Sequence, residues 1–84
     1  MTVEHHPLIK EFPEYRDEIH LLKVGDHKFR ELSEEYDQLD KEIYRIDQDI
    51  EPVSDEFAKQ LKSKRVLLKD ELYRKIQDFA VHRR

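Results

Sequence analysis

The chain has 84 residues, of which 43% are charged and 37% hydrophobic, and it contains one glycine, three prolines and no cysteine. This length fits one small domain, and the lack of cysteine excludes disulfides, thiolate metal sites and cysteine nucleophiles. The formal net charge is −4, but residues 1–53 hold 7 basic against 15 acidic residues, whereas residues 54–84 hold 9 against 5, so the two parts should attract each other.

The first predicted element is a short helix over residues 13–23. Pro13 stands at its first position and acidic residues follow, which is the usual composition of a helix start. Tyr15, Ile19 and Leu22 recur along it at spacings of four and three, and Gly25 supplies the stop. The preceding residues, 1–11, are predicted to form a flexible N-terminal segment.

The second predicted helix spans residues 26–50, with Asp26 as its N-cap. An apolar residue recurs along it at every third and then every fourth position, and this spacing continues without error over three heptads. Such a pattern is typical of a coiled-coil seam. The seam residues of this helix are Phe29, Leu32, Tyr36, Leu39, Ile43, Ile46 and Ile50.

A third helix is predicted over residues 55–80, after a connection in which Pro52 disfavours helical backbone at the residue before it and Ser54 can act as an N-cap. Because this connection is short, the two long helices should be antiparallel neighbours. The third helix is predicted to complete the seam with Phe57, Leu61, Leu68, Leu72, Ile76 and Phe79. Residues 81–84 are predicted to form a basic C-terminal tail.

The third helix also carries apolar residues beside the seam, so its apolar arc is wider than a two-stranded hairpin needs. The first helix, together with Phe12, should cover this arc, either in its own chain or in a partner. The candidate partner face consists of Tyr15, Ile19, Leu22, Val66, Leu67 and Tyr73. The predicted fold is therefore all-α, with a single helical domain over residues 12–80: a short N-terminal helix followed by a long antiparallel, coiled-coil-like hairpin, as a three-helix arrangement or a dimeric bundle.

No pattern of catalytic or metal-binding residues stands out. No two histidines have the i, i+4 spacing of helical metal ligands, and the single glycine excludes a glycine-rich phosphate loop. Acidic residues are often followed four positions later by a basic one, as in Asp37 and Lys41, which is the pattern of a solvated helix surface. We therefore expect no catalytic residue, metal, cofactor or small-molecule substrate, and we do not expect an enzyme.

The N-terminal residues lack the apolar run of a secretory signal, and no stretch reaches the ~20 apolar residues of a membrane-spanning helix. A soluble, cytoplasmic protein is expected. The leading hypothesis is a non-catalytic helical protein–protein interaction module, an adaptor or regulator, with a homodimer favoured and a different protein partner left open.

A nucleic-acid-associated protein is the alternative, because clustered lysine and arginine side chains contact phosphates. The candidate contacts are Lys59, Lys62, Lys64 and Arg65 of the third helix. The acidic net charge and the lack of aromatic residues among these cations favour instead a role in complementing the acidic second helix.

Three segments carry a family resemblance: FPEYRDEI at residues 12–19, LDKEI at residues 39–43 and LLKDELYRKI at residues 67–76. In this order and spacing they resemble the YdcH-like family of small uncharacterised bacterial proteins, over roughly residues 12–76. The resemblance implies a short, cytosolic bacterial protein that is largely helical with coiled-coil character. It supplies no catalytic or ligand-binding residue, so it names no activity.

Overall fold

The computed structural model describes residues 7–48 and 53–83. Its helices are α1 (Leu8–Glu11), the 3-10 helix η1 (Pro13–Tyr15), α2 (Arg16–Gly25), α3 (His27–Asp47) and α4 (Asp55–His82). No strand occurs within these described ranges. The predicted all-α fold is confirmed.

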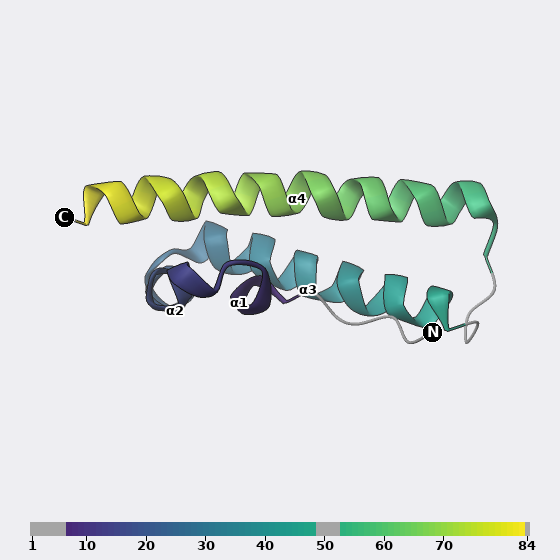
Figure 1. Ribbon diagram of the computed structural model, residues 1–84, viewed down its shortest axis with the longest axis horizontal. Coiled ribbons are helices and arrows are strands. Elements are labelled where there is room, and N and C mark those ends of the chain that lie inside the picture. Colours follow the sequence, from purple (N-terminus) through teal and green to yellow (C-terminus); the bar gives the residue numbers. More distant parts are fainter. Residues whose placement is uncertain (1–6, 49–52, 84) are drawn as a thin grey trace.

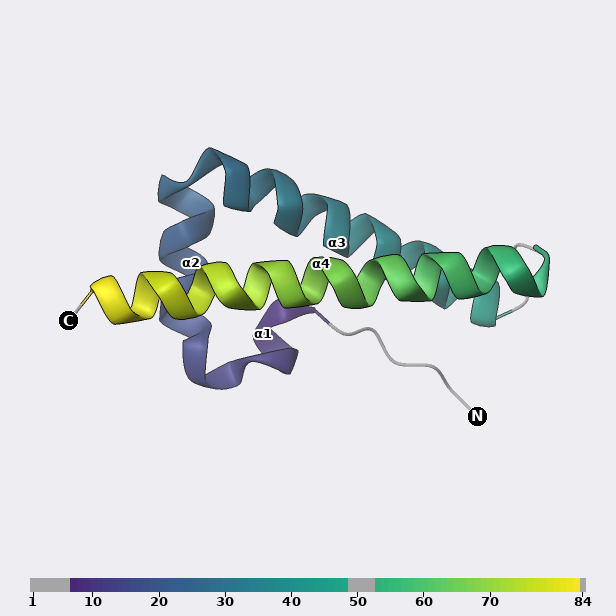
Figure 2. The same cartoon turned by 90° about the horizontal axis from the view of Figure 1, so that it is seen from above.

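The two long helices, α3 and α4, run antiparallel as a hairpin, and the N-terminal helices pack at one end of it (Figure 1). In this view α1, α2 and α3 all lie on the same side of α4. Seen from above, α2 runs across α4, so that α3 and α1 lie on opposite flanks of α4 (Figure 2). The opposite side of α4 is therefore left uncovered by the other described helices.

The hydrophobic core lies between α2, α3 and the C-terminal part of α4. Phe29, Tyr36, Ile19, Leu72 and Ile76 have no exposed surface. Burying a side chain of this size stabilises the fold by about 1.5–3 kcal/mol. Because α2 supplies Ile19 and Leu22 to this core, the first predicted helix packs within its own chain and makes a three-helix arrangement.

The predicted seam residues are buried unevenly along the hairpin. Those with less than 10% of their surface exposed are Phe29, Leu32, Tyr36, Leu39, Ile43, Leu68, Leu72 and Ile76. Ile46, Leu61 and Phe79 are partly buried, and Ile50 lies outside the described residues.

Phe57 is 40% exposed, which corrects its assignment to the buried seam. It lies in the first turn of α4, at the end of the hairpin away from α1 and α2 (Figure 2). There it lacks the third layer of side chains that buries Leu72 and Ile76.

Both ends of the helical domain extend further than predicted. Within the segment predicted to be flexible, Leu8 is buried, and the Pro7 carbonyl accepts backbone hydrogen bonds from Lys10 and Glu11 at 3.0 and 3.1 Å. The domain therefore begins before residue 12. At the other end, α4 continues to His82, inside the predicted tail.

Two polar side chains start the long helices as predicted. The Asp26 Oδ1 atom accepts a hydrogen bond from the Phe29 backbone N–H at 3.0 Å, and the Ser54 Oγ atom accepts one from the Phe57 N–H at 3.1 Å. Each cap of this kind contributes about 1 kcal/mol. The predicted N-caps of α3 and α4 are confirmed.

Candidate functional site

Two neighbouring aliphatic side chains lie exposed in the middle of α4. Val66 is 50% exposed and Leu67 is 69% exposed. Since α1, α2 and α3 all lie on one side of α4 (Figure 1), no other described helix covers the side that faces away from them. Clustered exposed apolar side chains mark binding surfaces, whereas single ones are common on any protein. We call Val66 and Leu67 the α4 patch.

The other four residues of the candidate partner face are covered within the chain. Ile19 and Leu22 are buried in the core. The ring of Tyr73 stacks on that of Phe12, with 4.7 Å between their centroids, and the Tyr15 ring meets it edge-on at 6.1 Å. Of the six predicted partner-face residues, the structure thus leaves the two of the α4 patch most accessible to another molecule.

Three of the four candidate nucleic-acid contacts form ion pairs with acidic residues of α3. The Lys62 Nζ lies 3.3 Å from the Asp47 carboxylate, and the Lys64 Nζ lies 3.2 Å from that of Glu35. Arg65 pairs with Asp40, while Lys59 is exposed. The basic run therefore complements the acidic helix beside it, as its position in the sequence indicated.

The pair between Arg65 and Asp40 is the most buried of these contacts. The Arg65 Nη1 donates a hydrogen bond to the Asp40 Oδ1 at 3.0 Å, and Asp40 is 5% exposed.

Tyr36 lies buried one turn before Asp40 on α3. Burial, helped by the negative charges of Asp40 and Glu11, raises the pKa of Tyr36 from 10.0 to about 12. A phenol with this pKa keeps its proton at neutral pH, so it is poorly suited to act as a general acid or base.

Asp37 and Asp40 also line a hollow of about 250 Å³, together with Pro7 and Lys41. Burial raises the pKa of the Asp37 carboxyl, although the nearby charges of Lys23 and Lys41 oppose this effect. The hollow presents carboxylates and an ammonium group.

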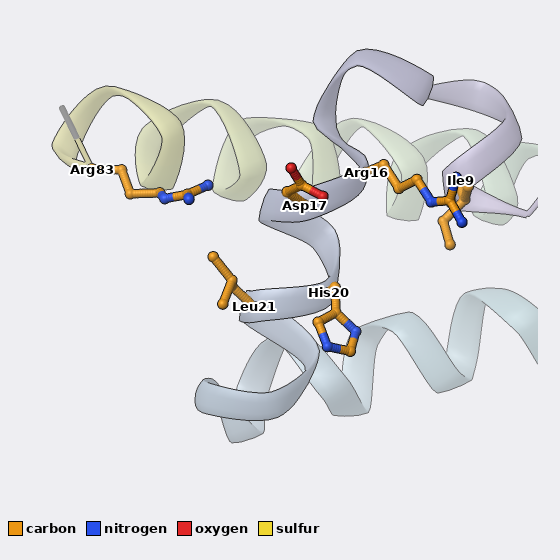
Figure 3. Close-up of a pocket in the computed structure, with 6 residues that line it drawn as sticks. All are labelled: Ile9, Arg16, Asp17, His20, Leu21 and Arg83. Carbon is orange, nitrogen blue, oxygen red and sulfur yellow. The ribbon is translucent and has the colours of Figure 1, made fainter.

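A larger hollow lies between α1, α2 and the end of α4 (Figure 3). Its volume is about 490 Å³, and it is lined by Ile9, Arg16, Asp17, His20, Leu21 and Arg83. Figure 3 shows Arg83 extending from the end of α4 toward α2. The Arg83 Nη1 also lies 3.7 Å from the Glu18 carboxylate on α2. This ion pair ties the C-terminal end of α4 to α2.

Sequence patterns contain little sign of this larger hollow. Leu21 falls off the periodic stripe of the first predicted helix, and Ile9 lies in the segment predicted to be flexible. Arg83 lies in the segment predicted to be a basic C-terminal tail. The hollow exists because α1 folds back beside α2, an arrangement that the spacing of apolar residues did not predict.

Two histidines form local pairs on their own helices. His27 lies 2.9 Å from Glu31, and His82 lies 3.5 Å from Asp78, both at i, i+4 spacing. Within residues 7–48 and 53–83, no three histidine, aspartate or glutamate side chains gather in a possible metal site. In the same ranges, no helix has the length and apolar character needed to span a lipid bilayer.

Comparison with known proteins gives one match. A family model described as a protein of unknown function (DUF465) matches residues 29–75, which is more than half of the chain. No curated protein and no solved structure matches. The matched span comprises α3 from Phe29 onward and α4 as far as Lys75, so the hairpin lies within it and α1, η1 and α2 lie outside it.

Proposed function

We propose that this chain, which belongs to the DUF465 family, is a non-catalytic helical interaction module, an adaptor or regulator that binds another protein through the α4 patch. The observation that carries this proposal is the exposure of Val66 and Leu67, at 50% and 69%, in the middle of the 28-residue helix α4. An amphipathic helix commonly binds its partner through a few apolar anchors of this kind.

A second copy of the chain is the partner that we favour. Small helical units gain buried apolar surface by association, and a two-fold axis through the α4 patch would place each Leu67 near its counterpart. We also infer that the YdcH-like resemblance and the DUF465 match describe one family. A small cytoplasmic bacterial protein would follow from that identification.

The ion pairs of the basic run favour protein binding over nucleic-acid binding. Lys62, Lys64 and Arg65 each contact an acidic residue of α3, so a phosphate group would have to compete with those carboxylates. Binding to phosphates would also weaken steeply as salt is added, whereas binding through apolar anchors would change little. A salt titration of any observed binding therefore separates the two functions.

The substitution Leu67→Glu tests the proposal directly. In sedimentation equilibrium over a wide dilution range, with protein that has not been unfolded and refolded at high concentration, we expect Leu67→Glu to dimerise far more weakly than the unmodified chain, with the same helical circular dichroism. Val81→Glu is the matched control, because Val81 is 66% exposed on the same helix but lies outside the patch. If Leu67→Glu leaves both the molar mass and the melting temperature unchanged, the α4 patch is not an interface between copies.

A further inference from the structure

A single residue separates α2 from α3. Gly25 ends α2 and His27 begins α3, and Asp26 between them has extended backbone angles, φ −124° and ψ 107°. Helical hydrogen bonds continue up to this residue from both sides. The Asp26 N–H donates to the Leu22 carbonyl at 2.8 Å, and the Arg30 N–H donates to the Asp26 carbonyl at 3.0 Å. A change of the two backbone angles of Asp26 would therefore join α2 and α3 into one continuous helix.

Side chains on the α3 side hold the bend. The Asp26 carboxylate accepts the Phe29 N–H at 3.0 Å, and so takes the place of the Gly25 carbonyl that a continuous helix would offer. The Arg30 Nη1 donates across the bend to the Lys23 carbonyl at 3.4 Å. Gly25 is not needed for the bend, since it is helical and nothing lies within 4 Å of a Cβ added to it.

Residues 7–25, which we call the N-terminal arm, pack on the hairpin through side chains that a second chain could supply equally well. Leu8, Ile19 and Leu22 are buried in the core. Phe12 stacks on Tyr73, and the Glu11 carboxylate lies 3.9 Å from the Lys69 Nζ. Because α2 runs across α4 (Figure 2), a continuous helix along the axis of α3 would carry the arm away from its own hairpin.

We propose that the N-terminal arm exchanges between two copies of this chain, with Asp26 as the hinge. In the exchanged dimer, α2 and α3 form one helix over residues 16–47, and each arm occupies the groove of the partner's hairpin. Every buried apolar contact of the arm is then restored between chains, as in other domain exchanges.

Exchange requires neither Val66 nor Leu67, so it is independent of the α4 patch. A dimer formed through the patch leaves each arm on its own hairpin, whereas an exchanged dimer places Glu11 of one chain beside Lys69 of the other. The two kinds of dimer are thus distinguishable by which chain these neighbouring residues belong to.

Cross-linking between single-cysteine variants tests the exchange, and the chain contains no other cysteine. Glu11→Cys and Lys69→Cys are prepared separately, mixed, unfolded in urea, refolded together at high concentration and treated with a short bismaleimide. Both variants also carry Leu67→Glu, which removes the patch dimer. We expect a cross-linked heterodimer, and a much lower yield when Lys59→Cys, on an exposed residue of α4, replaces Lys69→Cys.

Variants at the hinge test whether the cross-linked yield depends on the backbone conformation of residue 26. Adding Asp26→Ala should raise the cross-linked yield about tenfold at dilutions where the exchange is incomplete, because the cap of the bent form is lost and a better helix former stands at the residue that becomes helical. Asp26→Asn, which retains a capping side chain, should change the yield little. The proposal is overturned if refolded chains with the native hinge give no cross-linking above the Lys59→Cys level, or if a hinge variant with full helicity gives no increase.

Discussion

Replacing Arg65 by methionine should destabilise the hairpin far more than replacing its neighbours in the basic run. Methionine keeps a long apolar stem but removes the guanidinium from Asp40. In the structure, Asp40 is 5% exposed, and the two charged groups are joined by a 3.0 Å hydrogen bond. The substitution therefore removes from a buried carboxylate the guanidinium that offsets part of its loss of water.

The size of this effect follows from the burial of the two partners. Removing one member of a fully buried ion pair costs about 3–5 kcal/mol, whereas breaking an exposed pair costs about 0–1 kcal/mol. The Arg65 side chain is 23% exposed, so solvent screens part of the interaction. We expect a loss of about 2–4 kcal/mol. At ~0.05–0.15 kcal/mol per residue, the whole chain is stable by only about 4–12 kcal/mol.

Urea unfolding followed by circular dichroism measures this loss as a change in free energy at constant m-value. Lys64→Met is the matched control, because the Lys64 and Glu35 side chains are 57% and 47% exposed and their pair should be worth at most about 1 kcal/mol. Adding Asp40→Asn to Arg65→Met should recover part of the stability. If Arg65→Met unfolds at the same urea concentration as the unmodified chain, the argument from burial is wrong.

Two further predictions concern buried polar groups on α3. Burial raises the pKa of Tyr36 from 10.0 to about 12, so the folded state holds the phenol proton more tightly than the unfolded state. The stability that this proton contributes is therefore complete below pH 10 and is lost between pH 10 and 12. Tyr36→Phe should make the urea stability less dependent on pH over this range, and an unchanged dependence would show that another group is responsible. The Ser33 Oγ is buried with no hydrogen-bond partner, so Ser33→Ala should raise the melting temperature or leave it unchanged, with a gain in stability of up to about 1 kcal/mol. Ser63→Ala, at an exposed position of α4, is its control, and a marked loss of stability in Ser33→Ala alone would mean that the hydroxyl is bonded.

The parts of the fold that depend on local sequence could be predicted. The heptad spacing from Phe29 to Ile43 placed α3 and identified the side that it buries, because apolar residues at this spacing fall on one stripe of a helix. The capping roles of Asp26 and Ser54 also follow from local chemistry, since the side chain bonds to a backbone group three residues away.

The parts that depend on tertiary contacts could not be predicted in this way. α1 has four residues and shows no periodicity, and it packs on the core through the buried side chain of Leu8. The spacing of Phe57 fits the seam, but its exposure depends on what lies across from it. The sequence predicted that the apolar arc of α4 is wide. The part of this arc that stays exposed depends on where the N-terminal arm crosses α4. The arm covers Tyr73 but leaves Val66 and Leu67 exposed.

The contact between Arg65 and Asp40 has a consequence for the register of the hairpin. A heptad seam repeats, so sliding α4 along α3 by seven residues again matches apolar positions with apolar positions. One such shift would bring Asp40 level with Leu72, and the opposite shift would bring it level with Ala58 and Arg65 level with Ser33. Each shifted pairing would bury the carboxylate beside an aliphatic side chain, which is costly. This buried ion pair therefore favours the observed alignment of two helices whose apolar stripes would accept several.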